Sequence, residues 1–311
     1  MNMKKQTITL ALFLSLCLSA WAQKEYKIMK PAGKLILNLH GALIEGYDGN
    51  EIIFTSQRAP EEEDERAKGL QALSSSGFID NTGMGISVTE KGQDVEVNLI
   101  GNNKRGEALR IRVPKQVALV FNNNKSIFTD TLHIKNMQGE IEVSTSYNNV
   151  VLETNSGPMN IKTVYRDVEA TFENNVKGPI SIISVYGHVD VALPEATKAN
   201  LTLGTSYGKL YAAEDFNIAM TPKVEEKSDE ASAVEAAPPR SISVGEGRTA
   251  MVIPSAPSAP AAVSLGGLEA ITVTGFSYRS GEQESIEGTI NGGGIDLILK
   301  STYKNVYLRT P

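Results

Sequence analysis

Two carboxylates, Glu169 and Asp190, come closest in type and spacing to an active site. Each stands four positions after a tyrosine in a repeated phrase, so in stacked strands about 4.8 Å apart they would be neighbours. Retaining glycosidases hold their two carboxyl groups about 5 Å apart. Tyr211 and Tyr307, with Val151, occupy the same column and would offer rings for sugar stacking. The pair is a candidate for glycoside cleavage, and the alternative is two solvated surface acids.

A second catalytic pattern is the stretch GTSYG, Gly204 to Gly208, which matches the G-x-S-x-G nucleophile elbow at Ser206. That elbow needs a strand, a sharp turn and then a helix. Here the β-like segment KLYAA follows, and the position of Ser206 is occupied by serine, threonine or valine in the other copies of the phrase. The match is therefore interpreted as part of the repeat, and no catalytic residue is predicted there.

Metal and cofactor sites are not indicated. The three histidines, His40, His133 and His188, are far apart in sequence and fit no metal-binding spacing. The stretch NGGG, residues 291–294, lacks the Lys-Ser/Thr ending of a phosphate loop and predicts a tight corner. Cys17, the one cysteine, precedes the expected cleavage site, so no thiol chemistry or disulfide is expected in the mature chain.

A short phrase centred on a tyrosine occurs five times, with the first four copies 18, 21 and 21 residues apart. The tyrosines are Tyr147, Tyr165, Tyr186, Tyr207 and Tyr303. Two positions before them is a column of hydroxyl residues, Thr145, Thr163, Ser184, Thr205 and Ser301. Apolar residues fill the columns six and four positions before the tyrosine and three and five positions after it. This regularity indicates a structural unit.

The parity of these columns predicts how the unit folds. The positions six, four and two before the tyrosine, and the tyrosine itself, share one face of a strand. The change of parity afterwards predicts a corner, and a repeat of about 20 residues is typical of a stacked solenoid. The predicted fold is all-β, a single-chain parallel β-solenoid, with the first four tyrosines on adjacent turns and Ile182 and Leu203 inside. A meander of hairpins is the alternative, because a two-residue loop places the same positions on one face.

Three further segments complete the predicted organisation. Residues 1–22 have the charged, apolar and small-residue regions of a signal peptide, with cleavage expected between Ala22 and Gln23. A short helix is predicted near the N-terminus, from Pro60 to about Leu73. A low-complexity insertion rich in Pro, Ala, Ser and acids, at about 220–262, is expected to be disordered within the β-solenoid domain of residues 23–311.

The net charge and the leader limit the kinds of partner and the cellular location that we expect. The net charge is −6, and removing Lys4 and Lys5 with the leader makes it −8, which disfavours nucleic acid. No segment of the mature chain is long enough to span a membrane. We therefore expect an exported protein of the periplasm, cell surface or extracellular space.

The leader, the opening LILNLHGALIEGYDGNEIIF, the strand RIRVPKQV and the closing GTINGGGIDLILKSTYKNVYLRT together resemble the putative adhesin family of exported bacterial β-solenoid proteins, a domain of unknown function. The resemblance covers nearly all of the mature chain and implies a solenoid with an adhesive role; it supplies no catalytic residues.

The hypothesis is a non-catalytic adhesion or interaction surface, with an envelope protein or a glycan as partner. Two rivals remain: a carbohydrate-active β-helix that uses Glu169 and Asp190, and a scaffold that self-associates through unpaired strand edges at the solenoid ends.

Overall fold

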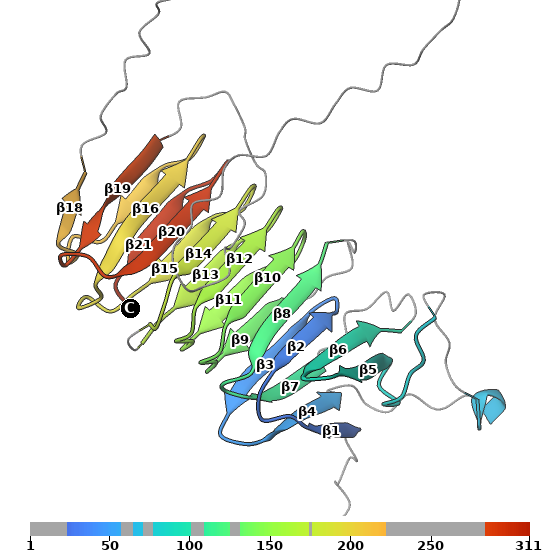
Figure 1. The fold of residues 1–311 in the computed structure, drawn as a ribbon. Coiled ribbons are helices and arrows are strands. Elements are labelled where there is room, and N and C mark those ends of the chain that lie inside the picture. The colour runs from blue at the N-terminus through green and yellow to red at the C-terminus, as the bar shows by residue number, and fades with distance from the viewer. Residues whose placement is uncertain are drawn as a thin grey trace, which may run out of the picture. The chain divides into compact units, whose positions relative to one another are not determined.

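The regular structure of the described residues is almost entirely β-strand (Figure 1), which confirms the all-β class. The structure is a computed structural model and describes residues 24–56, 65–70, 77–100, 109–124, 131–173, 176–221 and 284–311. The expected leader with Ala22 and Gln23, and residues 222–283 with most of the expected insertion, lie outside this part.

Twenty-one strands form two sheets, one of ten strands (sheet A) and one of eleven (sheet B). In spatial order sheet A contains β1 (Glu25–Met29), β4 (Glu51–Ser56), β7 (Leu109–Pro114), β3 (Ala42–Tyr47), β9 (Leu132–Lys135), β11 (Val150–Glu153), β13 (Val168–Thr171), β15 (Val189–Ala192), β21 (Val306–Arg309) and β17 (Leu210–Ala212). In spatial order sheet B contains β18 (Ile218–Met220), β19 (Glu284–Ile290), β16 (Ala199–Thr205), β20 (Ile295–Ser301), β14 (Ile180–Ser184), β12 (Met159–Thr163), β10 (Ile141–Thr145), β8 (Ala118–Asn123), β2 (Lys34–Asn38), β6 (Asp94–Leu99) and β5 (Ile86–Lys91).

Through the repeats the chain alternates between the two sheets. Strands β10, β12 and β14 belong to sheet B, and each is followed by a strand of sheet A. We call one strand of sheet B, the corner after it and the next strand of sheet A a rung. Neighbouring rungs pair in parallel without a register shift, so that Val143 lies opposite Ile161 and Ile161 opposite Ile182. Each copy of the sequence phrase is therefore one rung.

The core is a single cluster filled by the apolar columns of both sheets. Ile182 and Leu203 are buried, as predicted, and so are the residues three and five positions after the first three tyrosines. The exceptions, Leu210 and Ala212, lie on β17, the last strand of sheet A, where no further rung covers them.

The order of the rungs corrects the sequence prediction. Tyr186 and Tyr207 do not lie on adjacent rungs, because the rung of β20 and β21 is inserted between theirs. Figure 1 shows β20, in red, between the yellow-green β14 and the yellow β16, and β21 lies between β15 and β17 of sheet A. The C-terminal residues thus fill a position that the sequence order assigns to the fourth repeat.

The turn at residues 291–294 makes this insertion possible. Strand β19 pairs with β16 on one side and β20 pairs with it on the other, so the connection between them must pass the start of β16. Asn291, Gly292 and Gly293 have positive φ angles of 50°, 82° and 89°. The Asn291 side-chain amide donates to the carbonyls of Glu195 and Thr197, both at 2.8 Å, which holds the turn against the chain that enters β16.

At the N-terminal end, too, a rung is inserted out of sequence order. Strand β2 pairs in parallel with β6 and β8, and β3 pairs in parallel with β7 and β9, so the first rung is also inserted between later ones. Antiparallel pairs occur outside the parallel rungs: β5 on β6, β4 on β7 and β1 on β4 at one end, and β19 on β16 and β18 on β19 at the other. Antiparallel strands therefore close both sheets at the N-terminal end and sheet B at the other end, where sheet A ends on the parallel strand β17.

Most of the predicted short helix, from Pro60 to about Leu73, lies outside the described residues, which leave out 57–64 and 71–76. Of its described part, Glu65–Ala67 form a 3-10 helix of three residues, and Leu70 is exposed.

Replacing residues 222–283 with an eight-residue Gly/Ser linker should preserve the fold and raise the free energy of unfolding by up to about 2 kcal/mol. Strands β18 and β19 are antiparallel neighbours, and the Thr221 amide donates to the Glu287 carbonyl at 2.8 Å, so a short loop can join them. Each halving of a loop recovers about 0.6 kcal/mol of closure entropy, and this change is roughly three halvings. Urea unfolding would measure the change, and a loss of more than 1 kcal/mol would show that the replaced residues pack against the rungs.

Candidate functional site: the tyrosine corner

Five tyrosines form a continuous stack at one corner of the rungs, which we call the tyrosine corner. Ring centroids of successive members lie 4.7, 5.3, 4.6 and 5.0 Å apart, with interplanar angles between 5° and 13°. In rung order the members are Tyr147, Tyr165, Tyr186, Tyr303 and Tyr207. The stack joins side chains that are far apart in sequence into one surface.

The tyrosine side chains are not on the interior face, which corrects the parity prediction. Each strand of sheet B ends two residues before its tyrosine, and the next two residues form a bend. The alternation of faces therefore stops before the tyrosine and its side chain turns outward. The exposed fraction is 39% for Tyr303, 44% for Tyr186, 48% for Tyr165 and 62% for Tyr207.

The hydroxyl column lies beneath the corner and fixes its backbone. All five side chains are buried. The hydroxyl of Ser184 accepts the Gly187 amide at 2.9 Å within its own rung and donates to the Arg166 carbonyl of the preceding rung at 3.0 Å. Thr205 and Ser301 make the same two bonds, at 2.7–3.1 Å. Each of these three hydroxyls therefore closes its own corner and ties it to the corner of the preceding rung.

The other two members of the column differ in part. The Thr145 hydroxyl accepts the Asn148 amide at 3.4 Å, as in the other corners, but its short bond, at 2.5 Å, is to the Asn148 side-chain oxygen. The Thr163 hydroxyl is buried and has no hydrogen-bond partner among the described residues.

Thr205→Val should lower the free energy of unfolding by about 1–3 kcal/mol, because it leaves the Gly208 amide and the Lys304 carbonyl without the hydroxyl. The matched control is Thr163→Val, which removes a hydroxyl that has no partner and should be neutral or stabilising. Urea unfolding of the two variants would test the assignment. Equal losses would show that the column acts by packing alone.

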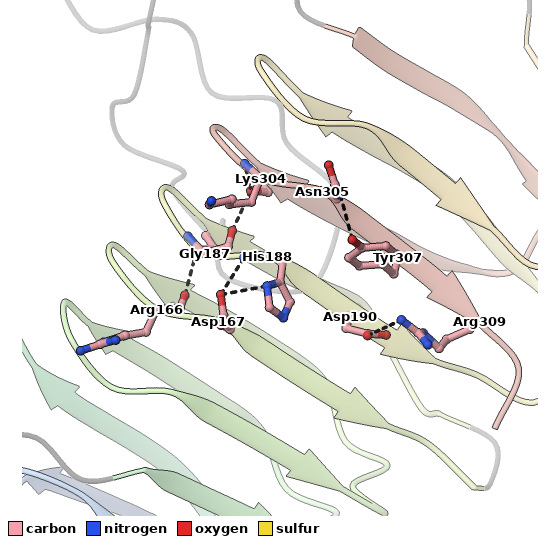
Figure 2. A network of polar contacts seen from close by, with 11 residues as sticks. Arg166, Asp167, Gly187, His188, Asp190, Lys304, Asn305, Tyr307 and Arg309 are labelled. Atoms are coloured by element: carbon pink, nitrogen blue, oxygen red, sulfur yellow. Dashed lines mark hydrogen bonds and ion pairs between the residues drawn. The ribbon is translucent and has the colours of Figure 1, made fainter.

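Next to the tyrosine corner, the outer face of sheet A carries a polar network (Figure 2). Figure 2 shows the Asp167 carboxylate facing His188; it accepts the His188 backbone amide at 2.9 Å and lies 3.1 Å from the ring nitrogen Nδ1. One rung further on, Asn305 donates to the Tyr307 hydroxyl at 2.8 Å. Tyr307 stacks on Tyr211, with centroids 5.3 Å apart. Half-buried polar and aromatic groups are thus fixed across neighbouring rungs.

Glu169 and Asp190 lie directly opposite each other on β13 and β15, as the columns predicted. Asp190 accepts a hydrogen bond from Arg309 at 2.6 Å, an ion pair that Figure 2 also shows. Arg309 lies on β21, so only the inserted C-terminal rung places this cation beside Asp190. One carboxylate of the candidate pair is therefore engaged by an arginine, and Glu169 is exposed.

The remaining candidates do not assemble into a site. Ser206 lies in the bend between β16 and β17, and a strand follows it where a nucleophile elbow needs a helix. Within the described residues no three His, Cys, Asp or Glu side chains gather closely enough to hold a metal ion. No helix in the same residues is long and apolar enough to cross a membrane.

Reasoning from the sequence missed the His188–Asp167 contact, the Arg309–Asp190 pair and the arrangement of cations beside the tyrosines. These residues all stand in the aligned columns of the repeat, but the sequence does not show the order in which the rungs stack. Lys300, Lys304 and Arg309 belong to the rung of Tyr303, which the sequence places last and the structure places fourth among the tyrosine rungs.

Comparison with known proteins gave one structural likeness. No family model and no curated protein matches the chain. A solved structure described as "a putative cell adhesion protein from Clostridium sporogenes ATCC 15579" is similar with a TM-score of 0.40 and 11% identity, over 93% of this chain and 100% of that chain. The function is therefore inferred from the tyrosine corner and the side chains around it.

Proposed function

We propose that the chain is an exported β-solenoid of the bacterial cell envelope that acts as a non-catalytic surface for adhesion or interaction. The solenoid is supported by the alternation of the chain between two sheets and by parallel, in-register pairing of rungs of about 20 residues. Export is supported by the leader pattern, and membership of the adhesin family by the order of features in the sequence.

The exposure of the tyrosine corner is the observation that carries the proposal. Tyrosine is enriched at binding surfaces because it offers a large apolar area with a polar tip. The core does not need these side chains, because it is filled by the aliphatic columns. A row of exposed aromatic side chains on four neighbouring rungs, with the half-buried Tyr147 on the fifth, suits an extended partner better than a small molecule.

A triple substitution at the corner tests this function. Protein coupled to beads should be retained on an array of immobilised glycans and envelope proteins, and Tyr165→Ser, Tyr186→Ser, Tyr303→Ser should reduce retention at least tenfold. The conservative triple Tyr→Phe variant, which keeps the stacked rings, reports how much the hydroxyls contribute, and circular dichroism verifies that each variant is folded. If the serine variant is retained as well as the wild type, the tyrosines have a structural role only. If the wild-type protein binds nothing on the array, the proposal is contradicted.

The enzymatic candidate rests on Glu169 and Asp190, which neighbour each other in register. The Arg309 ion pair favours a structural role for Asp190. We expect no turnover of envelope glycans by the wild type, and only modest loss of binding in Glu169→Gln, Asp190→Asn. Wild-type cleavage that this double variant abolishes would replace the adhesive function with the enzymatic one.

Self-association through the ends is the third candidate. The edge strands β17 and β18 are three residues long, and the edge strand β1 carries Glu25 and Lys27. The fourth edge strand, β5, is six residues long and carries Glu90 and Lys91. Short and charged edges discourage pairing between copies. These edges therefore favour a binding surface along the rungs.

A further inference from the structure

Two columns of side chains that each include two cations flank the tyrosine corner. The column directly after the tyrosines reads, in rung order, Asn148, Arg166, Gly187, Lys304 and Gly208. The column three positions before them reads Ser144, Lys162, Ile183, Lys300 and Gly204. Both columns place a cation on the rung of Tyr165 and on the rung of Tyr303, and on none of the other three.

This alternation is built into the backbone. A Cβ atom on Gly187 would lie 2.1 Å from the Arg166 carbonyl oxygen, and one on Gly208 would lie 2.1 Å from the Lys304 carbonyl oxygen. Side chains at this column are therefore excluded from the rungs of Tyr186 and Tyr207, and on the rung of Tyr147 the column holds the buried Asn148. Two rungs separate the cation pairs, a distance of about 10 Å at the usual strand spacing.

The four cations are available to a ligand. None of Lys162, Arg166, Lys300 and Lys304 forms an ion pair or side-chain hydrogen bond within the part of the chain that the structure describes. On the rung of Tyr165 the acids Asp167, which contacts His188, and Glu169 accompany the two cations, and Glu142 lies on the adjacent rung. On the rung of Tyr303 the cations Lys300, Lys304 and Arg309 face one acid, Asp296. This rung therefore has an excess of positive charge in a chain whose net charge is −6.

The tyrosines add hydrogen-bond donors and positive ring edges. Both faces of Tyr165, Tyr186 and Tyr303 are covered by neighbouring rings, and these side chains are still exposed, so their ring edges face solvent. Ring edges carry partial positive charge, and a phenol hydroxyl donates to anionic oxygens. The corner therefore presents ring edges along the stack, the hydroxyls of Tyr165, Tyr186 and Tyr207 as donors, and full positive charges on two rungs that are two rung spacings apart.

We propose that the tyrosine corner binds an acidic polysaccharide in which an acidic sugar alternates with a neutral one. A sugar residue in an extended β-linked chain is about as long as one rung, so its carboxylate or sulfate would meet Lys162 and Arg166, and the next one Lys300 and Lys304. The intervening neutral sugars would hydrogen-bond to the hydroxyls at the rungs without cations. This inference rests on the proposed function and names the class of ligand for it.

Nucleic acid fits the same surface less well. Single-strand binding proteins stack bases on open aromatic faces, and here successive rings cover those faces. The acidic net charge also repels a polymer with one phosphate per nucleotide.

Calorimetric titration with four probes tests the ligand class: a hyaluronan decasaccharide, in which glucuronate alternates with a neutral sugar; a neutral chitin oligosaccharide and an oligogalacturonide of similar length; and a single-stranded DNA decamer. Hyaluronan should bind at least tenfold more tightly than each of the other three, and its affinity should fall as salt is raised from 50 to 300 mM.

The variant Lys162→Gln, Arg166→Gln, Lys300→Gln, Lys304→Gln should weaken hyaluronan binding at least tenfold. A control with the same change in charge, Lys34→Gln, Lys68→Gln, Lys177→Gln, Lys198→Gln, alters exposed lysines elsewhere and should change it less than threefold. Equal binding of the chitin oligosaccharide would overturn the acidic specificity and leave the adhesive function intact. Tighter DNA binding would identify a nucleic-acid surface, and a chain that binds none of the probes would refute the inference.

Discussion

A chain that ends at residue 283 should lose its stable, cooperative fold. The truncation removes the inserted rung, and with it five fully buried aliphatic side chains, Ile290, Leu297, Leu299, Val306 and Leu308. Burying each such side chain contributes about 1.5–3 kcal/mol, so their combined loss approaches the roughly 5–15 kcal/mol that stabilises a typical domain. Strands β14 and β16 would also lose the backbone partner that lies between them. Thermal unfolding followed by circular dichroism would measure the effect.

A synthetic peptide of residues 284–311 should restore the transition when it is added to the truncated chain, because it can occupy the vacant rung and stabilise it by mass action. The same peptide with Leu299→Asp should fail, since it would bury a charge opposite Ile182 and Leu203. A truncated chain that melts at the full-length temperature without peptide would mean that β16 pairs directly with β14.

The insertion of both terminal rungs has a physical consequence for the ends of the stack. In a purely sequential stack the last rung is held by neighbours on one side only, and its apolar columns are partly uncovered. Here the first and last rungs along the chain lie inside the stack, with β2 between β6 and β8 and β20 between β14 and β16. Fraying from either end must therefore break contacts between segments far apart in sequence.

The columns of the repeat were predictable because they are local. The apolar positions, the hydroxyl column and the adjacency of Glu169 with Asp190 follow from a spacing that the sequence displays directly, and the structure has them. The rung order was not predictable, because every repeat offers the same kinds of residue to its neighbours. Because each column has the same kind of residue in every rung, the rung of Tyr303 could pack beside that of Tyr186 or that of Tyr207. The backbone geometry of the turn at residues 291–294 determines its actual position.

The outward direction of the tyrosines has a different cause. A strand alternates faces only while its backbone stays extended, and the hydroxyl two positions earlier bends the chain by accepting the amide that follows the tyrosine. The sequence contains the hydroxyl column, but not the hydrogen bonds that turn it into a corner. The polar network on the outer face of sheet A depends on the inserted C-terminal rung, because this rung brings Arg309 and Tyr307 beside Asp190.

Ile182→Ala should lower the free energy of unfolding by about 2–5 kcal/mol, because Ile182 is fully buried between two rungs. The matched control is Ile183→Ala, the neighbouring residue on the outer face of the same strand, which should cost under about 1 kcal/mol. Urea unfolding would measure both changes. Equal effects would show that the assignment of inner and outer faces is wrong.

A double-mutant cycle extends this test to the order of the rungs. Ile182 lies directly opposite Leu299, so alanine at both positions should show a coupling energy of about 0.5–3 kcal/mol. Leu203 lies opposite the other side of Leu299, two rungs from Ile182 and about 10 Å away, so that pair should be additive within about 0.5 kcal/mol. Coupling of Ile182 with Leu203 and not with Leu299 would show that the rungs follow their order in the sequence. The two-rung spacing of the cations would then be wrong as well, because it requires the rung of Tyr303 to lie between those of Tyr186 and Tyr207.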